Sequence, residues 1–312
     1  MKQIAKQALS RLKSLIGLAL LVLVLSLLSP HFLTTENLLN ITRQVAVNAI
    51  LATGMTFVII SAGIDLSVGS VLALSGCVMA IALNAGVGIF PGILLAVGVG
   101  SLCGLANGFM TGFLRVPPFI ATLGMMSIAR GLALVVTGGY PIFELPEGFS
   151  YLGTGYLWDV LPVSLLFTIL VVVAAHFVLT RMKLGRYVYV IGGNEEAAVL
   201  SGVNVRTTKM LIYTICGFLA GLASVVFVSR LNSAQPTAGI AYELDAIAAT
   251  VIGGTSLFGG VGSIGGTVIG ALIMGVLRNG LNLLNVSSFW QQVVIGVVII
   301  TAVYVDQLRH RN

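Results

Sequence analysis

Long apolar stretches without a charged residue alternate with short charged segments along the whole chain. The charge-free stretches are residues 14–35, 44–64, 66–114, 160–180, 210–229, 246–277 and 279–305. A bilayer core about 30 Å thick needs roughly 20 helical residues, so residues 66–114 hold two spans. We therefore expect about ten transmembrane helices, near residues 14–30, 44–62, 67–84, 89–112, 118–137, 160–180, 209–229, 245–257, 264–278 and 288–306.

This pattern predicts an all-α fold, a polytopic membrane helical bundle. If residues 245–257 and 264–278 form one re-entrant hairpin instead of two spans, the count falls by two and the orientation is unchanged. No change in composition along the chain marks a domain boundary, so we expect a single transmembrane domain over residues 1–312.

Two breaks rich in Gly and Ser interrupt the apolar sequence, at residues 61–70 and 253–263. The similar strings Ser-Val-Gly-Ser at 67–70 and Gly-Val-Gly-Ser at 260–263 each close a span that enters from outside. The spacing allows a weak internal repeat of about four spans. Irregular backbone persists at membrane depth only where it lines a cavity or is packed in protein, so interrupted helices are typical of transporters.

Composition excludes a soluble protein. Of the 312 residues, 57% are hydrophobic and only 8% are charged, whereas ordinary soluble domains are about 25% charged. So few charged side chains cannot supply the polar surface of a soluble domain of this size. Soluble enzymes, disordered proteins and collagen-like fibres are therefore excluded.

The distribution of basic residues predicts that both termini are cytoplasmic. With the N-terminus inside, only Arg43, Arg230 and Arg278 fall in outer segments. Twelve basic residues then fall in inner segments: Lys2, Lys6, Arg11, Lys13, Arg115, Arg181, Lys183, Arg186, Arg206, Lys209, Arg309 and Arg311. Most acids fall outside: Glu36, Glu144, Glu147, Asp159, Glu243 and Asp245. This positive-inside bias explains the net charge of +6 without a nucleic-acid partner.

A few polar residues lie within the apolar sequence, and each has two interpretations. Asp65 is either a pathway or gate residue, or, with Ser67, an N-cap of the following helix. Arg130 faces the bundle interior either as a structural partner of an acid or carbonyl or as a substrate contact. Asn48 and Asn107 either join helices by hydrogen bonds or line a pathway.

The segment 181–209 is the most informative polar stretch, because Asn194–Gly202 reads as a self-contained two-turn helix. Asn194 is a good N-cap, Glu195 and Glu196 lie at the positive end of the helix dipole, and Gly202 suits a left-handed stop. A helix this short is marginal alone and needs a docking partner. It is therefore either an idle connector or a docking element for a cytosolic protein.

The sequence shows neither an ATPase motif nor a set of catalytic residues. None of its five lysines follows a glycine, which excludes a P-loop. His31, His176 and His310 lie far apart, and we expect no metal site. The three cysteines lie in apolar runs and read as small buried hydrophobes. A transporter of this kind is either driven by ions or depends on an ATPase in another chain.

Several strings, spread in order over nearly the whole chain, resemble the permease subunits of bacterial ABC importers for monosaccharides, those for ribose most of all. They are Gly54–Thr56, Ser61–Ser70, Pro118–Met126, Leu184–Tyr187, Gly192–Glu195, Ala197–Ala198, Leu200–Gly202, Ser233–Gly239, Tyr242–Ala249 and Gly253–Leu257. The resemblance implies a homodimer in the inner membrane, with the pathway at or near the interface between the two copies.

The resemblance also implies partners. A periplasmic sugar-binding protein would deliver ribose, and a cytosolic ABC ATPase, usually with tandem nucleotide-binding halves, would use ATP and Mg while this chain binds no cofactor. The family's coupling helix falls on the helix read above, so the expected coupling residues are Gly193, Asn194, Glu195, Glu196, Ala197, Ala198, Ser201 and Gly202. The expected pathway residues are Asn48, Asp65, Ser67, Asn107, Arg130, Gln235 and Glu243.

Other functions stay open at this point. Permeases for xylose, galactose, allose or autoinducer-2 share most of these strings. A different class of protein, an ion-coupled secondary transporter, would use Asp65 and Arg130 as a charge relay. A structural membrane protein is disfavoured by the interrupted spans and the interior polar residues.

Overall fold

The computed structural model describes residues 2–158 and 160–311, and the side chains of residues 14–158 and 160–308. Asp159, expected among the outer acids, lies outside the described residues. The side chains of the terminal basic residues that support the predicted orientation, Lys2, Lys6, Arg11, Lys13, Arg309 and Arg311, are also outside the described part.

The described chain is almost entirely helical, which confirms the predicted all-α bundle. The helices are α1 Lys2–Leu28, α2 Thr35–Ile60, α3 Val68–Asn84, α4 Ile89–Gly112, α5 Pro118–Thr137, α6 Tyr151–Thr154, α7 Val163–Arg181, α8 Lys183–Gly193, α9 Glu195–Leu200, α10 Val205–Leu231, α11 Tyr242–Ile252, α12 Ile264–Leu283 and α13 Ser288–Arg311. A short antiparallel hairpin pairs β1 Tyr156–Leu157 with β2 Leu161–Pro162.

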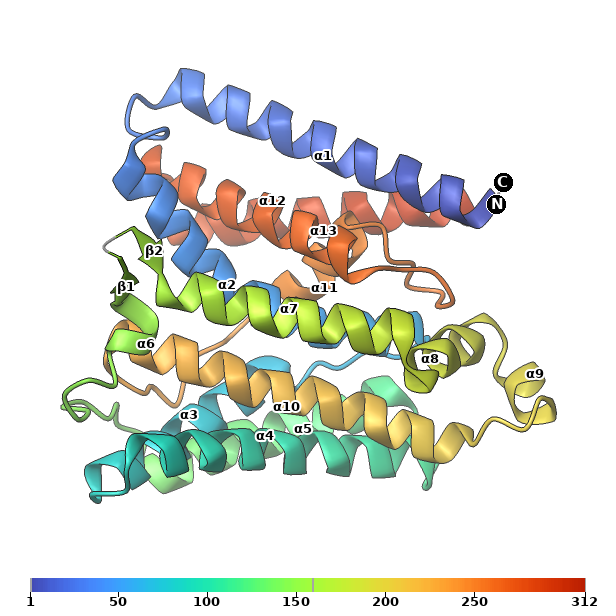
Figure 1. Ribbon diagram of the computed structural model, residues 1–312, viewed down its shortest axis with the longest axis horizontal. Helices are drawn as coiled ribbons and strands as arrows, with labels where there is room; N and C mark the ends of the chain where they lie inside the picture. Colours follow the sequence, from blue (N-terminus) through green and yellow to red (C-terminus); the bar gives the residue numbers. More distant parts are fainter. Residues whose placement is uncertain (1, 159, 312) are drawn as a thin grey trace.

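Ten of these helices overlap the ten predicted spans in position, although α11 is too short to be a span by itself. Within the described residues, seven are long and apolar enough to cross a membrane: α2, α4, α5, α7, α10, α12 and α13. The apolar part of α1 and the whole of α3 are shorter. Figure 1 shows the long helices side by side, with both termini, α8 and α9 at one end and α6, β1 and β2 at the other. The chain is therefore a multi-pass membrane protein.

The tightest helix pair in the bundle is α4 with α10, and small residues make it possible. Glycines recur every fourth residue of α4, at Gly100, Gly104, Gly108 and Gly112, on the face toward α10. A Cβ on Gly104 would meet the backbone carbonyl of Tyr213 in α10. In lipid, such close backbone approach is a main source of helix association, since burial of apolar surface contributes little there.

Three predicted span boundaries are wrong for one shared reason. The predictions 44–62, 209–229 and 264–278 each stop at or beside an arginine, but α2, α10 and α12 continue through Arg43, Arg230 and Arg278. These side chains turn toward partners inside the bundle instead of toward bulk water. An arginine that is paired inside the protein does not end a membrane helix.

The predicted span at 245–257 is also wrong, as is the alternative of a hairpin with 264–278. The helix found there, α11, has 11 residues, which is a rise of about 16 Å and roughly half of a bilayer core. Irregular segments 232–241 and 253–263 flank it, and α12 is a complete 20-residue helix. The helical backbone is thus interrupted at residues 253–263, as the break in the sequence indicated.

Candidate functional site

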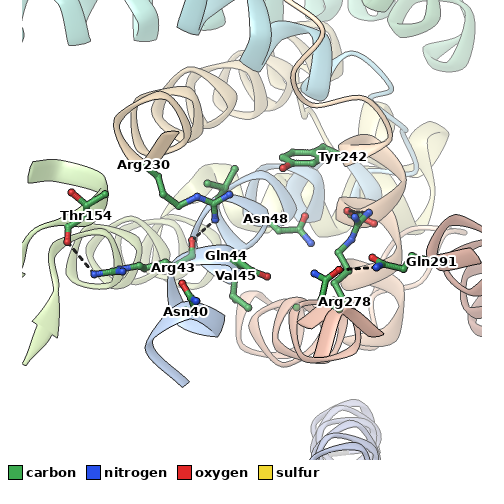
Figure 2. Close-up of a pocket in the computed structure, with 14 residues that line it drawn as sticks. Asn40, Arg43, Gln44, Val45, Asn48, Thr154, Arg230, Tyr242, Arg278 and Gln291 are labelled. Atoms are coloured by element: carbon green, nitrogen blue, oxygen red, sulfur yellow. Dashed lines mark hydrogen bonds and ion pairs between the residues drawn. The ribbon is translucent and has the colours of Figure 1, made fainter. Parts of the chain in front are cut away.

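A polar cavity of about 460 Å³ lies among α2, α10, α11, α12 and the start of α13, beside α6 (Figure 2). Most of the residues around it are polar, although the helices that carry them are apolar elsewhere. The lining residues are Asn40, Arg43, Gln44, Val45, Val47, Asn48, Thr154, Arg230, Tyr242, Asp245, Gly275, Arg278, Asn282 and Gln291.

Charged groups from different helices are paired around this cavity. Arg278 of α12 contacts the carboxylate of Asp245 in α11 at 2.6 Å, and Asp245 is only 3% exposed. Arg230 donates to the carbonyl of Arg43 at 3.2 Å, and Arg43 donates to the carbonyl of Thr154 at 3.0 Å. These bonds hold α2, α6 and α10 together and α11 to α12 (Figure 2).

Four buried side-chain atoms at the cavity have no hydrogen-bond partner among the described residues. They are two donors, Nε of Arg43 and of Arg278, and two acceptors, Oδ1 of Asn48 and of Asp245. A buried polar atom without a partner costs about 1–3 kcal/mol, so native proteins satisfy such atoms with water or a ligand. The cavity is therefore built to hold polar molecules.

Of the expected pathway residues, only Asn48 lines this cavity. Asp65, Ser67 and Asn107 form a separate buried cluster. Oδ1 of Asp65 accepts hydrogen bonds from the Ser67 amide at 2.9 Å and the Ser67 hydroxyl at 2.6 Å, and Asn107 donates to the same hydroxyl at 2.9 Å. Asp65 thus orders the turn that leads into α3, whose own N-cap, Ser67, makes no side-chain cap bond. A pathway role of Asp65 stays a prediction.

Arg130, Gln235 and Glu243 gather around the segment that precedes α11. Arg130 donates to the carbonyls of Pro236 at 2.5 Å and Ala238 at 2.7 Å, so it fastens the irregular segment 232–241 to α5. Of its two interpretations, this geometry favours the structural pairing with carbonyls. Gln235 is exposed and Glu243 is half-buried in the first turn of α11, and neither lines the cavity.

The predicted short helix is present as α9, with the predicted caps. The side chain of Asn194 accepts from the Ala197 amide at 2.8 Å, and Gly202 has φ +79° just beyond the helix end. Glu195 forms a 2.7 Å ion pair with Lys209 on α10. Gly193 precedes the cap and Ser201 follows the last helical residue.

The two faces of α9 differ sharply, and the sequence reasoning missed the residues on one of them. Ala198 is buried against Ile191 and Val205, so it anchors the helix instead of facing a partner. Leu200 is 89% exposed and Val199 is 58% exposed. The sequence did hold a signal for this exposed face. Val199 and Leu200 are apolar residues at the end of a charged two-turn helix, and an idle connector needs neither.

The helix before α9 touches both breaks in the membrane helices. A Cβ on Gly192 of α8 would meet the carbonyl of Ile60, at the end of α2, and the amide of Gly260. That amide donates to the same Ile60 carbonyl at 2.8 Å, and the Tyr189 hydroxyl donates to the carbonyl of Gly262 at 2.8 Å. We call this contact of α8, the end of α2 and the segment 253–263 the glycine junction.

A second hollow of about 620 Å³ lies beside α9, between the α4–α5 connection and the start of α10. It is basic, with three cations against one acid. Its lining residues are Thr111, Gly112, Arg115, Val116, Pro117, Pro118, Glu195, Val199, Val203, Asn204, Val205, Arg206 and Lys209. Glu195 and Val199 of α9 line this hollow, and α9 lies at the end of the bundle that holds both termini (Figure 1).

Known proteins share this sequence over almost its whole length. A family model described as the permease component of a branched-chain amino acid transport system matches residues 37–303. The chain belongs to this permease family. The ribose import permease of Escherichia coli strain K12 is 50% identical over 298 residues, which are 94% of this chain and 92% of that protein.

Two further relatives of this permease extend the comparison. The ribose import permease of Bacillus subtilis strain 168 is 49% identical over 299 residues, 95% of this chain and 92% of its own. The D-allose transport system permease of Escherichia coli strain K12 is 42% identical over 293 residues, 93% of this chain and 90% of its own. The predicted resemblance to sugar permeases is confirmed.

Proposed function

We propose that this permease is the membrane-spanning subunit of an ATP-driven importer that carries ribose from the periplasm to the cytoplasm by alternating access. The observation that carries the proposal is its identity of about one half, over more than nine-tenths of both chains, to ribose import permeases of two different bacteria. The allose and xylose permeases are less similar, at 42% and 36% identity, which favours ribose over either sugar.

The proposal places the protein in the bacterial inner membrane with both termini cytoplasmic. It includes a second copy of the chain, a periplasmic sugar-binding protein and a cytosolic ABC ATPase that binds ATP and Mg. The basic residues support this orientation, because those at the end with α8 and α9 outnumber those at the end with α6.

In this mechanism, α9 is the part that the ATPase moves. Its acids Glu195 and Glu196 and its exposed Leu200 offer charge and an apolar anchor to a groove in the ATPase. Movement of α9 pulls on α8, and the glycine junction passes the displacement to the end of α2 and to the segment before α12. Since α2 and α12 line the polar cavity, ATP-driven motion at one end reshapes the cavity toward the other end.

An ion-coupled transporter is the competing function, and the geometry disfavours it. In an ion-coupled transporter, Asp65 and Arg130 would both have to lie on the ion pathway and relay charge along it. Asp65 is held by Ser67 and Asn107, and Arg130 is held by backbone carbonyls of another segment. Both side chains are accounted for by structural bonds.

Uptake in a strain that lacks this gene tests the proposal. Radiolabelled ribose should enter the parent and the complemented strain but not the deletion strain, and excess unlabelled ribose should compete better than xylose, galactose or allose. An ATPase subunit should co-purify with the chain in mild detergent. Proton-driven ribose uptake by the purified chain alone in vesicles would instead establish the ion-coupled alternative.

A further inference from the structure

We propose that the hollow of about 620 Å³ beside α9, the basic hollow lined by Arg115, Arg206 and Lys209 among others, binds the phosphate headgroup of an anionic phospholipid. It lies where α4 ends and α5 begins, at the end of the bundle that holds both termini (Figure 1). The inference rests on the proposed function only for the orientation, which turns this end toward the cytoplasm and so selects the inner leaflet.

The charges at the basic hollow select an anion. Lys209 is paired at 2.7 Å with Glu195, the one acid among the lining residues. Arg115 and Arg206 are exposed and form no ion pair with any described residue. A guanidinium can donate two parallel hydrogen bonds to the oxygens of one phosphate. Two such groups at one hollow therefore favour a phosphate as the ligand.

Helix stability and turn chemistry do not account for either arginine. Arg206 lies in the first turn of α10, which contains no acid, and the positive end of the helix dipole opposes a cation there. Arg115 has φ +56°, a left-handed conformation in which Gly is the usual residue. A bound phosphate would offset the repulsion at the start of α10.

Backbone packing brings the two arginines to the same hollow. A Cβ on Gly112, at the end of α4, would meet the backbone carbonyl of Arg206. The amide of Val116 donates to the carbonyl of Met110 at 3.0 Å, which turns the connection after α4 back over the helix end. The volume of about 620 Å³ lies within the range of about 300–1,000 Å³ usual for small-molecule sites. The site is therefore a shaped one on a packed helix pair.

Exposed apolar side chains next to Arg115 favour a lipid over a soluble phosphate. Leu114 is 59% exposed and Ile120 is 55% exposed. Phe113 and Phe119 are exposed as well, at the end of α4 and the start of α5, two helices long and apolar enough to cross a membrane. Acyl chains can cover this surface while the headgroup reaches the hollow, whereas a soluble anion gains nothing from it. Basic pockets between membrane helices at the cytoplasmic surface bind lipid headgroups in this way.

Lipid binding by the full-length permease, with any ATPase that stays bound to it, tests the site. The protein is purified in mild detergent, stripped of lipid and mixed with equal concentrations of phosphatidylglycerol or phosphatidylcholine, and native mass spectrometry measures the lipid bound. Arg115→Gln with Arg206→Gln removes two cations from the hollow. Lys183→Gln with Arg186→Gln is the matched control, because it removes two exposed cations of α8 that do not line the hollow.

We expect the wild-type and control chains to bind phosphatidylglycerol in preference to phosphatidylcholine, with one strong site in each copy. The variant without the two arginines should bind phosphatidylglycerol about tenfold more weakly or worse, because it loses two charge-assisted donor groups. Arg115→Lys with Arg206→Lys keeps the charge and should recover part of the affinity. All variants should melt at nearly the wild-type temperature, since the substituted side chains are exposed.

Several results would overturn the headgroup site. Equal weakening by the two glutamine variants would show a diffuse attraction to the basic end of the bundle. Displacement of phosphatidylglycerol by an equal concentration of inorganic phosphate would show that the hollow takes a free phosphate. Loss of the ATPase with unchanged lipid binding in the Arg115→Gln, Arg206→Gln chain would assign these arginines to an acidic surface of that partner.

Failure of the proposed function has a separate signature. Lipid binding is measured without ribose, so a chain that prefers phosphatidylglycerol but does not import ribose would refute the proposed function and leave the headgroup site in place. A wild-type chain that imports ribose but shows no preference for phosphatidylglycerol would refute the headgroup site alone.

Discussion

The backbone amide of Gly260 donates a 2.8 Å hydrogen bond to the carbonyl of Ile60, so the two breaks in the membrane helices meet. Gly192 of α8 fits against both partners because it has no side chain. The element that leads into α9 is therefore packed, backbone to backbone, against the end of α2 and the irregular segment before α12.

Gly192→Ala tests the importance of this contact. The added methyl group meets backbone atoms of Ile60 and Gly260, so the junction must shift, at a cost of about 1–3 kcal/mol for overpacking. We expect a lower melting temperature and a large loss of ribose uptake, measured on the same membranes. Gly296→Ala in α13 is the control, since a Cβ there has nothing within 4 Å. Equal effects of the two substitutions would contradict the junction.

Gly104→Ala tests the close packing of α4 on α10. The new Cβ meets the carbonyl of Tyr213, so we expect a loss of about 1–3 kcal/mol in the free energy of unfolding. Gly98→Ala lies in the same helix with open space around its Cβ. It should be neutral or stabilising by up to about 1 kcal/mol, from helix propensity alone. Denaturation in mild detergent compares the two, and identical midpoints would rule out the packing argument.

Asn194→Ala removes the cap of α9. Loss of an N-cap costs about 1 kcal/mol, and a six-residue helix has little else to hold it. We expect weaker co-purification of the ATPase with a nearly unchanged melting temperature. Asn204→Ala removes the corresponding cap of α10, a 27-residue helix, and should leave ATPase binding intact. If both variants retain the ATPase equally, the cap has no part in coupling.

Leu200→Asp tests the exposed apolar anchor. Because Leu200 is 89% exposed, the substitution removes almost no packing within the chain. We expect normal membrane levels and melting temperature but loss of the bound ATPase and of ribose uptake. Leu200→Met keeps an apolar side chain and should keep both activities. Full uptake by Leu200→Asp would exclude this residue from the docking surface.

Reversing the acids of α9 gives a further test. Glu195→Lys with Glu196→Lys opposes the helix dipole and replaces the exposed ion pair with Lys209 by a repulsion. Exposed pairs of this kind contribute only about 0–1 kcal/mol, so the chain should still reach the membrane. Ribose uptake should be abolished, as a transport assay beside an immunoblot of membranes will show. Normal uptake would refute the docking role of α9.

Local sequence was sufficient for much of the fold and for α9. Charge-free stretches located the helices because lipid excludes unpaired charges, and Asn194 and Gly202 marked the ends of α9 because capping depends on neighbours in the chain. The bonds from Ser67 to Asp65 are likewise local, because the two residues are only two positions apart in the chain. The four-residue glycine spacing in α4 was also visible, although its partner helix was not.

Only the tertiary structure decided what the charges inside helices do. Arg43, Arg230 and Arg278 looked like span ends, because a charge in the sequence says nothing about its partner in another helix. Folding pairs Arg278 with Asp245 and brings Asn48 beside them. The sequence by itself determined a helical membrane protein with a short capped helix at residues 195–200, since these depend on hydropathy and near neighbours. The polar cavity and the contact of Gly192 with Ile60 depend on long-range packing, which brings distant helices within hydrogen-bonding distance.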